Sequence, residues 1–106
     1  MAQLYTLGEW TVKGGKHQEF VAAWHEFAEW TAANISGSAW AKLLQDGDAP
    51  ERFISFGPWQ SEEAVTGWRE HPGFQERVAR IHELVEGFRP HTMGVAAEVG
   101  PATPDP

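Results

Sequence analysis

Aromatic rings are the side chains of this sequence that are best suited to bind a ligand. The 106 residues include six tryptophans, six phenylalanines and one tyrosine. Each ring has a large apolar area that must be buried or line a site, and the indole N–H adds a hydrogen-bond donor. Two interpretations stay open, core or interface packing and a pocket for a flat aromatic ligand, and several rings can serve both.

Residues for metal, thiol and nucleotide chemistry do not form the necessary patterns. The sequence has no cysteine, which excludes disulfides, thiolate nucleophiles and cysteine-ligated metals. Metal-ligand spacing is missing among His17, His25, His71 and His91. Neither a complete phosphate-binding loop nor a glycine-rich dinucleotide fingerprint is present. We therefore predict no metal and no cofactor.

Charge and length narrow the class of protein. The net charge of −7, with scattered Lys and Arg, argues against a nucleic acid or an anionic membrane as partner. No segment approaches a membrane span, and residues 1–10 do not resemble a signal peptide. We expect a soluble cytoplasmic protein with one domain over residues 1–100 and a disordered proline-rich tail over residues 101–106.

The first half of the chain predicts a strand, a helix and a hairpin. β-branched and aromatic residues without a helical period indicate a strand over residues 4–12. Phe20, Trp24, Phe27 and Thr31 recur at helical spacing and predict an amphipathic helix over residues 16–33. Residues 38–44 and 52–59 read as two strands that are joined by a loop.

The second half predicts a broken helix and a last strand. Ser61 is a good helix cap, and the acids after it favour a helix start. Pro72 cannot sit inside a regular helix, so we expect a break near His71 and a restart. The apolar spacing extends the second piece through Phe74, Val78, Ile81, Val85 and Phe88. The last strand is then expected over residues 91–99.

This order of elements, βαββαβ, predicts an α+β ferredoxin-like fold. Right-handed crossovers assemble it into a four-stranded antiparallel sheet with both helices on one face. The first strand is apolar on both sides, with Tyr5 and Leu7 on one and Trp10 and Val12 on the other. The sheet face without helices needs a second cover, so we predict a homodimer through that face.

The run from Arg52 to Gln75, RFISFGPWQSEEAVTGWREHPGFQ, resembles the signature of the antibiotic biosynthesis monooxygenase family. That signature has a strand ending in tryptophan, a Ser-Glu opening, a second aromatic residue and a His-Pro break before a phenylalanine. The segment VKGGKHQEFVAAWHEF is also similar to the start of such domains, and the resemblance covers residues 4–99. It implies a dimeric α+β barrel, with a pocket in each subunit between its own sheet and helices.

The best-known members of that family imply two activities. Some oxidise phenolic or anthrone-like polyketides to quinones without metal or flavin, and others degrade haem. Trp59 lies where both kinds place a pocket tryptophan, and Ser55 lies where the phenol oxidisers have an asparagine. Gly8 and Val78 occupy the positions of the asparagine and the iron-binding histidine of haem degraders, which makes haem breakdown a poor expectation.

The resemblance therefore implies a cofactor-independent monooxygenase that acts on a small aromatic or polyketide-like molecule with molecular oxygen. The candidate catalytic residues are Trp59, Ser55 and, as a base, His25, because an imidazole exchanges protons near neutral pH. The candidate substrate-binding residues are Trp24, Trp68 and Phe27 as walls and Arg80 for an anion. Two alternatives use the same pocket: a non-enzymatic dimer that binds a small hydrophobic ligand, and an isomerase or cyclase.

Overall fold

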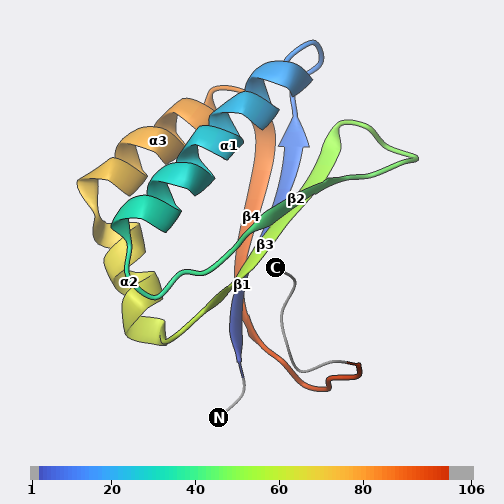
Figure 1. The fold of residues 1–106 in the computed structure, drawn as a ribbon. Helices are drawn as coiled ribbons and strands as arrows, with labels where there is room; N and C mark the ends of the chain where they lie inside the picture. The colour runs from blue at the N-terminus through green and yellow to red at the C-terminus, as the bar shows by residue number, and fades with distance from the viewer. Residues whose placement is uncertain (1–2, 101–106) are drawn as a thin grey trace.

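Four strands and three helices make up the part of the chain that the computed structural model describes, residues 3–100 (Figure 1). The strands are β1 (Leu4–Val12), β2 (Lys42–Gln45), β3 (Arg52–Trp59) and β4 (Val85–Gly94). The helices are α1 (His17–Asn34), α2 (Glu62–Glu70) and α3 (Pro72–His82). The predicted tail over residues 101–106 lies outside the described residues.

The strands form one antiparallel sheet in the order β2-β3-β1-β4, and the helices lie on one of its faces (Figure 1). Gly8 of β1 is opposite Ser55 of β3 on one side and Pro90 of β4 on the other. The predicted α+β ferredoxin-like fold is confirmed. None of the helices within residues 3–100 is both long and apolar enough to cross a membrane.

The core lies between the sheet and the helices α1 and α3. Phe20, Trp24, Phe27 and Thr31, the residues whose spacing predicted the helix, are its buried positions. Phe20 has no exposed surface and packs against Trp10 of β1 and Phe53 of β3, with ring centroids 5.4 and 5.0 Å apart. The aromatic residues at helical spacing on α1 therefore pack against the inward-facing aromatic residues of β1 and β3 in one cluster.

The break in the second helix occurs where proline predicted it. Ser61 caps α2, because its Oγ accepts a hydrogen bond from the Ala64 backbone N–H. α2 ends at Glu70, and His71 has an extended backbone. Its Nδ1 accepts from the Gly73 N–H at 2.9 Å and caps α3, whose first residue is Pro72.

The predicted end of the second helix and the predicted last strand are wrong. α3 ends at His82, and β4 runs from Val85 to Gly94 instead of over residues 91–99. The register of β4 shifts opposite Thr11 and Val12, so that Val85 pairs with Val12 while Phe88 pairs with Trp10. This bulge turns both Val85 and Phe88 toward the helices, at a spacing of three residues that imitates a helical period.

The second strand is also shorter than predicted. β2 begins at Lys42, and Ser38 makes only an isolated bridge to Trp59. The chain between them passes closely over Gly57: a Cβ there would lie 2.4 Å from the backbone oxygen of Trp40. The segment therefore leaves the sheet where glycine permits the close approach.

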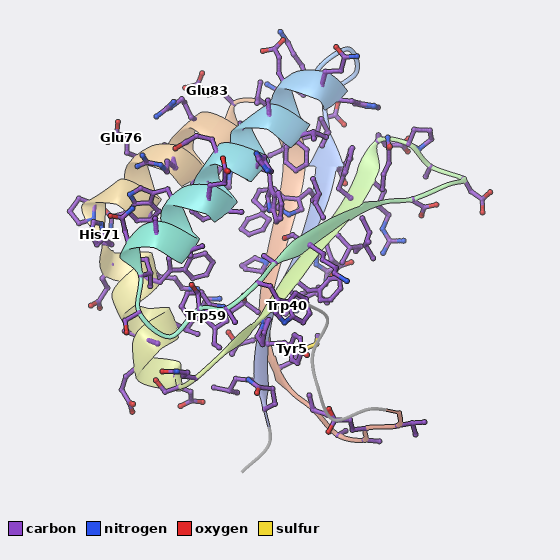
Figure 2. All side chains as sticks on the ribbon, viewed as in Figure 1. Tyr5, Trp40, Trp59, His71, Glu76 and Glu83 are labelled. Carbon is purple, nitrogen blue, oxygen red and sulfur yellow. The ribbon has the colours of Figure 1, made fainter. Side chains whose placement is uncertain are left out.

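The sheet face away from the helices is largely apolar. Alternation along the strands places Tyr5 and Leu7 of β1 and Ile54 and Phe56 of β3 on this face. The Trp40 ring packs edge-on against Tyr5, with centroids 6.1 Å apart. The two labelled side chains lie next to each other in Figure 2. No helix or strand within residues 3–100 covers this surface, which we call the bare sheet face.

Candidate functional site

A cavity of about 570 Å³ lies between the sheet and the helices. Its walls are mainly aromatic. Trp68 of α2 is central, with ring centroids 4.8 Å from Trp59 of β3, 4.8 Å from Phe74 of α3 and 5.7 Å from Phe27 of α1. Trp59 is placed among these rings from the end of β3, between the sheet and α2 (Figure 2). Four elements thus build one apolar wall.

The sheet side of the cavity consists of small residues. Thr6 is opposite Gly57, and Gly8 is opposite Ser55, and all four line the cavity. Because neighbouring large side chains come from α1, α2, α3 and the strand ends, these small residues leave space above the middle of the sheet. The cavity therefore lies between glycines and hydroxyl residues on the sheet side and aromatic rings on the helix side.

Each of three cavity tryptophans donates its indole N–H to a hydroxyl oxygen of the protein. Trp10 donates to Ser55 Oγ at 2.9 Å, Trp59 to Thr6 Oγ1 at 3.0 Å and Trp68 to Thr31 Oγ1 at 3.0 Å. Thr31 in turn donates to the Phe27 carbonyl at 2.9 Å. Within residues 3–100, the Thr6 and Ser55 hydroxyl protons have no acceptor, so these two neutral groups are the donors that a ligand can use.

Charged side chains approach the cavity only at its rim. His25 Nδ1 lies 3.4 Å from Glu29 Oε1, and both side chains are more than two-thirds exposed (68% and 70%). Arg69 also lines the cavity and donates to Thr92 Oγ1 at 3.3 Å. The interior is therefore neutral, with one imidazole, one carboxylate and one guanidinium at its edge.

The structure brings most of the predicted site residues together. Trp24, His25, Phe27, Ser55, Trp59 and Trp68 all line the cavity. The Trp59 indole N–H already donates to Thr6 Oγ1 within the protein. Their catalytic and binding roles stay predictions.

Arg80 does not line the cavity. Its side chain is 63% exposed and lies 3.8 Å from Glu76 Oε1 on the same helix. Val78 faces the cavity, and two residues further along a helix the direction turns by about 200°. Arg80 therefore lies outside this cavity, and Arg69 is the arginine at its rim; a substrate-binding role for Arg80 stays a prediction.

Sequence reasoning also missed Thr6 and Trp10. The signal was available, because both alternate with Gly8 along β1 and so share its face. What the sequence did not contain was the pairing of Gly8 with Ser55, which brings the Trp10 ring to the hydroxyl.

Comparison with known proteins places this geometry in a family. The sequence profile described as antibiotic biosynthesis monooxygenase matches residues 4–80. No curated protein sequence matches significantly.

Several solved structures share the fold at low sequence identity. The cofactor-independent oxygenase SnoaB from Streptomyces nogalater has a TM-score of 0.84 and 17% identity, over 93% of this chain and 98% of its own. A candidate antibiotic biosynthesis monooxygenase from Nitrosomonas europaea has a TM-score of 0.79 and 19% identity, over 94% of this chain and 97% of its own. A conserved protein from Methanosarcina mazei has a TM-score of 0.79 and 19% identity, over 89% of this chain and 93% of its own. Because the family profile spans most of the sequence, this chain belongs to the antibiotic biosynthesis monooxygenase family.

Proposed function

We propose that this protein is a cofactor-independent monooxygenase that oxidises a small aromatic, polyketide-like molecule with molecular oxygen. The observation that carries the proposal is the cavity itself, with aromatic walls and the neutral hydroxyls of Thr6 and Ser55 on its sheet side. Membership of the family supports it, and so does the likeness in fold to a cofactor-independent oxygenase.

Such a cavity suits a substrate that supplies its own electrons. An anthrone-type molecule loses a proton to form an electron-rich anion, and His25 at the rim is the candidate base. Hydroxyl donors stabilise the oxygen of that anion, and the rings of Trp59 and Trp68 hold its plane and exclude water.

The reaction then balances without a further reductant. The anion gives one electron to dioxygen, and the two radicals combine into a C–O bond at the ring carbon. Loss of water leaves a carbonyl where two hydrogens had been, so one oxygen atom ends in the product and the other in water. Four electrons leave the substrate carbon, and dioxygen takes up all four.

We expect the purified protein to consume one dioxygen per anthrone converted to anthraquinone. Ser55→Ala should lower kcat/KM at least about tenfold, since it removes a donor to the developing oxyanion. Trp59→Phe should also lower kcat/KM, because Thr6 Oγ1 then loses the indole N–H from which it accepts a hydrogen bond. Oxygen-electrode traces and product absorbance measure both, with Ser36→Ala, an exposed serine outside the cavity, as the matched control.

The alternatives give different outcomes in the same assay. Anthrone that binds without oxygen uptake would favour a ligand-binding protein and overturn the oxygenase. A product that forms equally under nitrogen would favour an isomerase or cyclase.

We also propose that two copies of the chain pair through the bare sheet face. Leu44 and Met93 on that face are 52% and 47% exposed, which is costly for large apolar side chains in a monomer. The face also carries both signs of charge: Glu9 accepts from His91 at 2.7 Å and from Arg52 at 3.3 Å. The His91 hydrogen bond holds the pKa of Glu9 below its usual value. A surface that is both apolar and of mixed charge can complement itself across a two-fold axis.

Sedimentation analysis checks this assembly. We expect wild-type protein to sediment as a dimer at micromolar concentration, and Met93→Glu to sediment as a monomer because a charge would be buried at the interface. Val21→Glu on α1, where the wild-type residue is 43% exposed, is the control and should remain dimeric. A wild-type monomer would contradict the proposal.

A further inference from the structure

Gly8 of β1 and Ser55 of β3 are opposite each other in the sheet, and the Trp10 side chain lies next to both of them. The Trp10 Nε1–H donates to Ser55 Oγ at 2.9 Å. The indole is only 3% exposed and is held in place by stacking on Phe88, with centroids 4.0 Å apart and planes at 25°. Trp10 is therefore a rigid donor that lies beneath the cavity.

Gly8 leaves the space that this hydrogen bond occupies. A Cβ at position 8 would lie 2.9 Å from Ser55 Oγ, 3.0 Å from Trp10 Nε1 and 3.0 Å from Phe88 Cε1. All three approaches are tighter than ordinary van der Waals contact. A side chain here would displace the ring or the hydroxyl.

The hydrogen bond determines how Ser55 can meet a ligand. An indole N–H only donates, so the Ser55 oxygen has to accept it and the hydroxyl proton has to point elsewhere. Ser55 lines the cavity, and within residues 3–100 its proton has no acceptor. A ligand oxygen in the cavity would take that proton.

We propose that Trp10 is a positioning residue: it fixes the Ser55 hydroxyl as a donor into the cavity and thereby selects ligands that present a carbonyl or phenolate oxygen at this point. Without the indole N–H, the hydroxyl could rotate and accept from a ligand N–H or O–H equally well. The inference rests on the proposed function in one respect, that this cavity is the ligand site. It does not depend on oxygen chemistry.

Three tricyclic probes of one shape test the selection. 9-Fluorenone carries a carbonyl acceptor, carbazole carries an N–H donor and fluorene carries neither. Equilibrium dialysis with absorbance detection gives their dissociation constants for the wild type, Trp10→Phe, Ser55→Ala and the double variant. Trp30→Phe is the matched control, because Trp30 is a partly buried tryptophan outside the cavity.

We expect both Trp10→Phe and Ser55→Ala to reduce the preference for fluorenone over fluorene by about three- to tenfold, the worth of one neutral hydrogen bond. The double variant should lose no more than Ser55→Ala alone, because both changes remove the same interaction. Trp10→Phe should also gain carbazole affinity relative to fluorene, and Ser55→Ala should not. General loss of packing would weaken all three probes alike, so it cannot produce this reversal.

An unchanged fluorenone preference in Trp10→Phe would overturn the inference, and so would a wild type that binds none of the probes. Ser55→Ala removes only one oxygen atom, so it keeps the test decisive if Trp10→Phe does not fold. A wild type that shows the preference but consumes no oxygen with anthrone would leave this inference standing and overturn the oxygenase proposal.

Discussion

Replacing Ala28 with phenylalanine should weaken anthrone binding by about 10- to 100-fold, because the new ring takes apolar space worth about 1.5–3 kcal/mol to a ligand. Ala28 lies on the side of α1 that faces the cavity and is partly buried against the core. The cavity has a volume of about 570 Å³, so a phenylalanine side chain at this position can extend into it instead of into the packed core. Binding and oxygen uptake should fall together.

Ala33→Phe is the control for that experiment. Ala33 is exposed on the same helix and does not line the cavity, so the same change in side chain should leave anthrone affinity within about twofold of wild type. Urea denaturation shows whether both variants keep their fold. Undiminished turnover in a folded Ala28→Phe protein would place the site outside this cavity.

Phe20→Ala should cost the fold about 3–5 kcal/mol of unfolding free energy, the range for a fully buried phenylalanine. Phe20 is completely buried and joins α1 to both central strands through Trp10 and Phe53. A domain of this size has a total stability of about 5–15 kcal/mol, so the loss is a large fraction of it. Urea unfolding followed by far-ultraviolet circular dichroism measures the change.

Val21→Ala, the next residue on α1, provides the comparison. Val21 is 43% exposed, and we expect its truncation to cost less than about 1 kcal/mol. If both variants lost the same stability, the core would not be centred on Phe20.

The elements that were predicted well are those whose residues carry a local signal. The period of Phe20, Trp24 and Phe27 specifies a helix, and Pro72 specifies where the second helix divides. Val85 and Phe88 were wrongly predicted to continue the second helix, because a bulge in β4 gives these two strand residues the spacing of a helix. Such a bulge depends on the neighbouring strand, so no local pattern reveals it.

The site shows the same division. Trp24, Phe27, Trp59 and Trp68 reach the cavity because helical and strand periods already direct them to the sheet's covered face. Arg80 lies outside the cavity because its direction on α3 points it toward solvent, and residue type alone does not reveal that direction. The tryptophan–hydroxyl hydrogen bonds, such as that of Trp10 with Ser55, join residues far apart in the sequence and depend on strand register.

Pro90 interrupts the outer edge of the sheet at the middle of β4, opposite Gly8. An edge strand normally offers a row of free N–H and C=O groups on which another chain can add a strand, and repeated addition produces fibres. Proline has no N–H, so the row is broken halfway along β4. Self-association of this protein is thereby directed away from open-ended fibre growth at this edge.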